Sequence, residues 1–96
     1  MAEVQLRLDE KKHGAFYISE EGEQLGEMMV TVGDDRVTAH HTEVSPKAEG
    51  KGYAKQMFER MVSYARENRL QIVPLCTYVQ AQLKRRAAEY ADVWKS

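Results

Sequence analysis

The sequence contains a single cysteine, two prolines and no long apolar run. With only Cys76 available, no internal disulfide can form, so the fold does not depend on an oxidising compartment. No apolar stretch approaches the roughly 20 residues that a membrane-spanning helix needs, and the first residues lack the basic-then-apolar order of a signal peptide. We therefore expect a cytoplasmic protein that does not enter a membrane.

Length and composition indicate one globular domain spanning residues 1–96. Chains of this size form a single domain with room for one modest core. Hydrophobic residues make up 43% and charged residues 30% of the chain, which excludes extensive disorder. Composition alone leaves open whether the domain is an enzyme or a binding module.

Charge is unevenly distributed along the chain. The formal net charge of −1 argues against general nucleic-acid binding. Residues 1–50 carry five Lys and Arg against eleven Asp and Glu, whereas residues 51–96 carry nine against four. The basic second half favours a phosphorylated ligand and the acidic first half a cationic amine, although each charge taken alone also fits a solvated surface.

The first 44 residues predict four antiparallel strands joined by polar turns. Apolar and polar residues alternate over residues 4–8, residues 15–18 form a β-prone run, residues 25–32 place Met28, Val30 and Val32 on one face, and residues 36–44 form the fourth strand. Regular alternation along the fourth strand would place Val37, Ala39, His41 and Glu43 on one face and Thr38, His40, Thr42 and Val44 on the other. The adjacent His40 and His41 would then point to opposite faces, so we expect no metal site there.

From Gly52 onward the apolar period becomes that of a helix. The apolar stripe comprises Ala54, Met57, Phe58, Met61, Val62 and Ala65. It predicts an amphipathic helix ending near Asn68 or Arg69, followed by a short apolar strand over 70–75. Because crossovers of this type are right-handed, the fifth strand should lie parallel to the fourth.

The end of the chain completes the predicted fold. Pro74 cannot donate a ladder hydrogen bond, so pairing should fail near the end of the fifth strand. A weaker helical stretch runs from about 78 to 88, and Tyr90, Val93 and Trp94 should dock on the body of the domain. The fold class is thus α+β, with a mixed sheet of four antiparallel strands, a helix, a parallel fifth strand and a second helix.

Two glycines join the fourth strand to the first helix in the order Gly50-Lys51-Gly52. A helix entered through such a turn offers its first backbone N–H groups and the positive end of its dipole to an anion, and glycine lets a phosphate approach closely. The turn therefore predicts a phosphate site. The alternative, in which the glycines serve only the geometry of the turn, stays open for so short a motif.

Cys76 follows the fifth strand and precedes the second helix. Ligands of α/β sheets bind at the carboxyl ends of parallel strands, so Cys76 and the glycine turn point to the same rim. A thiol there can act as a nucleophile, with His41 as the candidate base that deprotonates it. Packing as a small buried hydrophobe is the alternative for Cys76.

Together these motifs resemble the GNAT superfamily of acyl-CoA N-acetyltransferases. The family signature Gln/Arg-x-x-Gly-x-Gly/Ala reads here Lys47-Ala48-Glu49-Gly50-Lys51-Gly52, with lysine in place of the usual Gln or Arg. The chain looks most like the very small single-domain subfamily similar to the human N-acetyltransferase domain-containing protein and its bacterial relatives. The matching segments are His41-Thr42-Glu43-Val44, Gly50-Lys51-Gly52, Cys76-Thr77-Tyr78 and Tyr90-Ala91-Asp92-Val93.

The resemblance implies an acetyltransferase that uses acetyl-CoA as co-substrate, acts on an unidentified amine and needs no metal. Pantetheine would lie between strands four and five, and Cys76 would be the suspected acyl acceptor or catalytic residue. Direct attack by the amine stays open, with Cys76 either donating a proton to the departing CoA thiolate or only packing. The residues expected at the cofactor are Val44, Gly50, Lys51, Gly52, Tyr53, Ala54, Lys55 and Tyr78. We expect no nucleic-acid or membrane partner, and a monomer or weak dimer.

Two other functions remain compatible with the sequence. One is a CoA-binding protein of the same fold without turnover, and the other is a small interaction module whose sheet pairs with partners. Cofactor binding separates the module from the other two. Turnover separates the enzyme from the binding protein.

Overall fold

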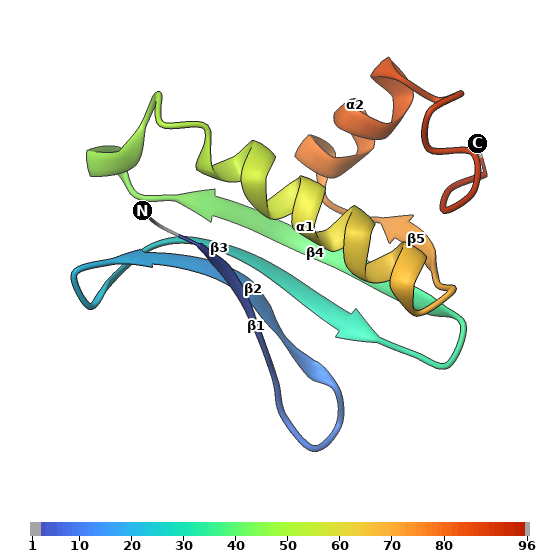
Figure 1. Cartoon of the computed structure of the whole chain (residues 1–96), viewed down its shortest axis with the longest axis horizontal. Helices are drawn as coiled ribbons and strands as arrows, with labels where there is room; N and C mark the ends of the chain where they lie inside the picture. Colours follow the sequence, from blue (N-terminus) through green and yellow to red (C-terminus); the bar gives the residue numbers. More distant parts are fainter. Residues whose placement is uncertain (1–2, 96) are drawn as a thin grey trace.

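A computed structural model of the chain describes residues 3–95 as a five-stranded sheet with two α-helices (Figure 1). The strands are β1 (Val4–Leu8), β2 (His13–Glu20), β3 (Glu23–Val32), β4 (Arg36–Val44) and β5 (Gln71–Pro74). The helices are the short 3₁₀ turn η1 (Pro46–Ala48), α1 (Tyr53–Glu67) and α2 (Thr77–Arg85). The α+β class expected from the sequence is confirmed.

The sheet has the order β1-β2-β3-β4-β5. Strands β1 to β4 pair antiparallel, and β5 pairs parallel to β4 directly beside it. Helix α1 crosses the sheet and contacts all five strands, while α2 lies against β4 and β5 (Figure 1). Within residues 3–95, neither helix is long and apolar enough to span a membrane.

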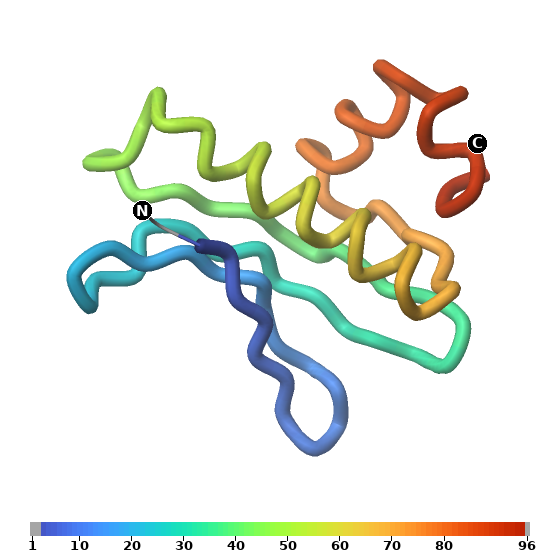
Figure 2. The backbone as a smooth tube through the Cα atoms, in the orientation of Figure 1, coloured from blue at the N-terminus to red at the C-terminus, as the bar shows by residue number. Residues whose placement is uncertain are grey.

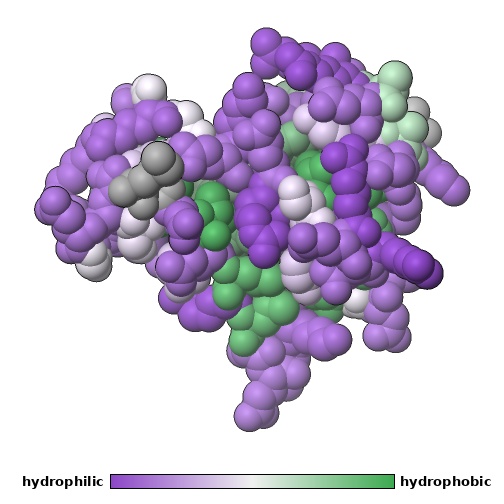
Figure 3. Space-filling model, viewed as in Figure 1, coloured by the Kyte–Doolittle hydropathy of each residue, from purple (hydrophilic) through white to green (hydrophobic). Residues whose placement is uncertain are grey.

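The hydrophobic core lies between α1 and the sheet. The buried residues of α1 are Tyr53, Met57, Phe58, Met61, Val62 and Ala65, which is the predicted stripe with Tyr53 added and Ala54 only partly buried. They meet Phe16 and Met28 of the sheet, and each fully buried side chain of this kind stabilises the fold by about 1.5–3 kcal/mol. The face drawn in Figure 3 is mostly hydrophilic, with apolar surface gathered near the middle of the view.

A β-bulge in β4 changes the predicted faces of that strand. Val30 pairs with Ala39 but Met29 pairs with His41, so His40 is the extra residue. After the bulge the faces are exchanged relative to regular alternation: Thr42 and Val44 are partly buried, whereas His41 and Glu43 are exposed. The expectation that Val37, Ala39, His41 and Glu43 share one face is therefore wrong.

The bulge also brings the two adjacent histidines to the same exposed face. His40 Nε2 lies 2.8 Å from Thr31 Oγ1, and His41 pairs with the exposed Met29. The reason given above against a metal site at these histidines is thus incorrect. Among residues 3–95, however, no group of three His, Cys, Asp or Glu side chains is placed to hold a metal ion.

The pairing of β4 with β5 ends at Pro74, as predicted. Its last pair is Ala39 with Pro74, after which the N–H groups of both Leu75 and Cys76 donate to the Ala39 carbonyl, at 3.0 and 2.9 Å. Figure 2 shows β4 continuing past the point where the chain leaves β5 and turns into α2. Within the described residues 3–95, the edge of β4 over residues 40–44 therefore has no strand beside it on the β5 side.

The tail docks on the body, as expected. Helix α2 ends at Arg85, three residues before the expected position, and the chain then folds back in turns. The buried Val93 accepts a hydrogen bond from the Ile72 N–H at 2.6 Å, which covers part of the free edge of β5. Tyr90 packs edge-on against Phe58, with ring centroids 5.4 Å apart.

The C-terminal turn of α1 offers a stability test. Leu70 N–H donates to Ala65 C=O and Arg69 N–H to Arg66 C=O, the bonding pattern of a Schellman turn, in which glycine is usual at the position of Arg69. Arg69 has a φ of 55°, which strains a side chain. We expect Arg69→Gly to raise the free energy of unfolding by about 1 kcal/mol in urea denaturation. Arg69→Ala keeps the strained Cβ and should give no gain; equal stability of the two variants would contradict the prediction.

Candidate functional site

The loop between β4 and α1 has the geometry of an anion-binding turn. Ser45 begins η1, and its Oγ accepts a hydrogen bond from the Lys47 N–H at 3.4 Å. Gly50 and Gly52 then adopt φ angles of 82° and 77°, in the left-handed region that favours glycine. Gly52 is the N-cap of α1, so the second glycine of the motif leads directly into the helix.

The first turn of α1 presents unpaired N–H groups. Gln56 donates the first bond of the helix, to the Gly52 carbonyl at 3.0 Å, which leaves Tyr53, Ala54 and Lys55 without a backbone acceptor among residues 3–95. This turn contains no carboxylate. A Cβ built on Gly50 or Gly52 would meet no atom within 4 Å. The turn thus combines donors, the positive end of a helix dipole and open space, which together suit a phosphate.

The lysines around this turn are engaged differently. Lys51 Nζ lies 3.2 Å from Glu20 Oε2, and Lys47 Nζ lies 2.9 Å from Glu23 Oε2. Lys55 has no carboxylate within ion-pair distance in the described part of the chain. Of the three side chains, only Lys55 therefore has an unpaired ammonium group.

Glu20 also accepts a hydrogen bond from the Tyr53 hydroxyl. This bond raises the pKa of Tyr53, and together with Lys51 it lowers the pKa of Glu20. The sequence analysis did not identify Glu20 or Glu23 as part of the site. They reach the loop only through the pairing of β2 and β3, and no local motif marks them.

Cys76 lies beside the unpaired edge of β4. It is the N-cap of α2, it is 6% exposed, and its Sγ lies 3.2 Å from Thr42 Oγ1. His41 is on the opposite face of β4, where its Nε2 lies 3.0 Å from Glu43 Oε1. The structure therefore brings Cys76 together with Thr42 and not with His41, the expected base. The bulge at His40 causes this exchange, and Thr42 was not among the catalytic residues expected from the sequence.

A hollow of about 150 Å³ lies beyond the loop, between α1, α2 and the tail. Its lining residues are Lys55, Phe58, Glu59, Tyr78, Gln82, Arg85, Arg86, Glu89 and Tyr90. Two residues expected at the cofactor, Lys55 and Tyr78, meet in this hollow, and burial raises the pKa of Tyr78. Arg85 and Arg86 were not expected at the site from the sequence; they add positive charge, and Arg86 Nη1 lies 3.5 Å from Glu89 Oε2 of the same hollow.

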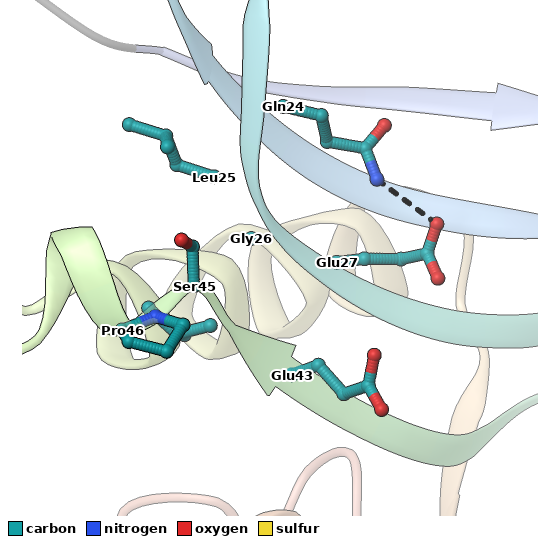
Figure 4. A pocket seen from close by; sticks show the side chains of 8 residues that line it. Gln24, Leu25, Gly26, Glu27, Glu43, Ser45 and Pro46 are labelled. Carbon is teal, nitrogen blue, oxygen red and sulfur yellow. Dashed lines mark hydrogen bonds between the residues drawn. The ribbon is translucent and has the colours of Figure 1, made fainter.

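A larger hollow, of about 490 Å³, opens where β3 begins and β4 ends (Figure 4). Its lining residues are Gln24, Leu25, Gly26, Glu27, Glu43, Val44, Ser45 and Pro46. Glu27 and Glu43 are cross-strand partners, and Gln24 donates to Glu27 at 3.1 Å. Val44, an expected cofactor residue, thus lines a hollow whose charged side chains are both acidic.

Known proteins resemble this chain in sequence and in fold. Residues 15–93 match the family model for GCN5-related N-acetyltransferases. The solution structure of a GCN5-like protein from Staphylococcus aureus is 28% identical, covers 100% of this chain and 92% of its own, and superposes with a TM-score of 0.70. No curated protein matches the sequence.

Another similar structure is a ribosomal-protein-alanine N-acetyltransferase from Brucella melitensis biovar Abortus 2308. It superposes over 71% of this chain with a TM-score of 0.63 at 17% identity. The match covers 52% of that enzyme, so this chain spans about half of its length. At this identity the likeness concerns the fold alone.

Proposed function

We propose, because the chain belongs to the family of GCN5-related N-acetyltransferases, that it binds acetyl-CoA and transfers the acetyl group to an amine. The observation that carries this proposal is the start of α1, where two glycines with left-handed backbone and open space beside their Cα atoms lead into N–H groups without a backbone acceptor among residues 3–95. A pyrophosphate suits such a site because it is anionic and accepts several hydrogen bonds.

The proposal assigns each part of CoA to residues of this chain. The N–H groups from Gly52 to Lys55 bind the pyrophosphate. The ammonium group of Lys55 supplies positive charge at the same turn. Pantetheine runs along the edge of β4 that faces β5, where the pairing with β5 has ended at Ala39 and residues 40–44 are paired on the β3 side alone among residues 3–95. The hollow that contains Tyr78, Arg85 and Arg86 receives the adenosine end with its additional phosphate.

Cys76 is the residue we place at the acetyl group. In a first step its sulfur attacks the acetyl carbonyl, the bond between that carbon and the CoA sulfur breaks, and CoA leaves with the proton that the thiol gives up. In a second step the acceptor amine attacks the acetyl-cysteine, the amide forms, and the thiol is restored. Thr42, 3.2 Å from the sulfur, is placed to orient it.

One observation favours a second function, CoA binding without turnover. The hydroxyl of Thr42 is the side-chain partner of Cys76, and no carboxylate or imidazole hydrogen-bonds the thiol within residues 3–95. A nucleophilic thiol ordinarily has a base beside it. Release of free CoA from acetyl-CoA in the presence of an amine separates the enzyme from the binding protein.

A thermal-shift experiment tests the binding that both functions share. CoA at 100 times its dissociation constant should stabilise the protein by about 2.7 kcal/mol, which raises Tm by roughly 10 to 20 °C in a domain of this size. Pantetheine at the same concentration lacks the pyrophosphate and serves as the control, with little or no shift expected. The absence of any shift with millimolar CoA would contradict both functions.

The cytoplasmic location and the monomeric or weakly dimeric state stay predictions.

A further inference from the structure

The turn between β2 and β3 brings two carboxylates into ion-pair contact with the lysines of the glycine loop. Glu20 ends β2 and Glu23 begins β3, and they pair with each other across the hairpin. Glu20 contacts Lys51 at 3.2 Å, and Glu23 contacts Lys47 at 2.9 Å. The two lysines lie on either side of Gly50, so the hairpin neutralises the ammonium groups that flank the turn.

Neutralisation matters because a phosphate needs the same ammonium groups. In the structure their charges are satisfied by carboxylates, while the backbone donors at the start of α1 remain open. A pyrophosphate that recruits Lys47 or Lys51 has to separate it from its carboxylate first. It also has to approach the negative charge of the hairpin.

We propose that Glu20 and Glu23 form an electrostatic latch that withholds Lys51 and Lys47 from CoA, so that CoA binds more weakly than the glycine loop alone would allow. The latch opens when the phosphates of CoA replace the carboxylates as partners of the lysines. This inference rests on the proposed function, since it concerns the same phosphate site.

The exposure of these pairs sets the size of the effect. In the first pair, the side chain of Lys51 is 47% exposed and that of Glu20 is 36% exposed. In the second pair, the side chain of Lys47 is 70% exposed and that of Glu23 is 56% exposed. Ion pairs this exposed change an equilibrium constant by up to about fivefold. Removing one carboxylate should therefore tighten CoA binding about threefold to fivefold, and removing both about tenfold.

Glutamine is the appropriate replacement at both positions. Its amide oxygen can still accept the hydrogen bond from the Tyr53 hydroxyl, so Glu20→Gln removes the charge and keeps the contact that positions the first residue of α1. Glu10→Gln is the matched control. Glu10 is exposed in the turn between β1 and β2, at the other end of β2 from the loop.

Isothermal titration with CoA tests the latch on the full chain. We expect Glu20→Gln, Glu23→Gln and the double variant to lower the dissociation constant as stated, and Glu10→Gln to leave it unchanged. Unchanged or weaker binding in the double variant, with CoA still binding the wild type, would overturn the latch and leave the proposed function standing. Failure of every form to bind CoA would overturn both.

The pKa of Glu20 gives a second readout that a purely structural role would not change. In the free protein the hydrogen bond from Tyr53 and the contact with Lys51 hold the pKa of Glu20 below its ordinary value. Loss of Lys51 to a phosphate should raise this pKa, which carboxyl-carbon NMR can follow with and without saturating CoA. A pKa that stays the same on saturation would show that Lys51 never leaves Glu20, and would overturn the proposal.

Discussion

Replacing Gly52 with valine should weaken CoA binding by about tenfold or more while the domain still folds. Gly52 has a φ of 77°, which a β-branched residue adopts only with strain of about 1–2 kcal/mol. A Cβ at this position meets no atom within 4 Å, so the new side chain extends into the volume proposed for the pyrophosphate. Titration calorimetry measures the loss, and urea denaturation checks that the variant is folded.

Gly22 provides a matched control for this substitution. It has a φ of 80° in the turn between β2 and β3, and a Cβ there also meets no atom within 4 Å. Gly22→Val should therefore cost similar stability without blocking the phosphate site. If it separates Glu20 or Glu23 from its lysine, the proposed latch predicts tighter rather than weaker CoA binding. An unchanged dissociation constant in folded Gly52→Val would show that the loop is only a turn.

Much of the fold follows from local patterns in the sequence. The bounds of β1 and β4 agree with the structure, and those of α1 and β5 differ by a residue or so, because apolar periodicity reports which positions of one element face the core. Pro74 marked the end of the β4–β5 pairing for an equally local reason, since proline cannot donate to the ladder. The glycine turn was recognised from two glycines that stand between a strand pattern and a helix pattern, and both adopt left-handed φ angles in the structure.

The errors concern features that depend on distant segments. The bulge at His40 arises from the way β4 pairs with β3. Its one local sign is that Val44 is out of phase with Val37 and Ala39, which does not show where the extra residue lies. The bulge reverses the faces of His41 and Thr42, so that Thr42 lies beside Cys76 in place of His41. Similarly, the contact of Glu20 with Lys51 spans 31 residues and exists only once the sheet has formed.

Cys76→Ala should lower the rate of acetyl transfer by about a hundredfold or more if the thiol carries the acetyl group as proposed. Incubation of the wild type with acetyl-CoA in the absence of an amine should give an intact mass increased by one acetyl group, mapped to Cys76 by peptide analysis. The same treatment of Cys76→Ala should give no adduct. The substitution removes a single sulfur at a site that is 6% exposed, and circular dichroism verifies that the fold persists.

Substitutions of Thr42 and His41 test which of the two side chains acts beside Cys76. The structure, with its bulge in β4, places Thr42 there, whereas regular alternation of β4 would place His41 there. Thr42 Oγ1 lies 3.2 Å from the Cys76 sulfur, whereas His41 is on the other face with Glu43. Thr42→Val keeps the shape of the side chain and removes the hydroxyl, so it should lower kcat with little change in the affinity for CoA. His41→Ala should cost less than Thr42→Val, because its imidazole does not reach the thiol. A Cys76→Ala variant that turns over at the wild-type rate would exclude the thiol from the reaction. A larger loss of kcat in His41→Ala than in Thr42→Val would contradict the arrangement of side chains around the thiol.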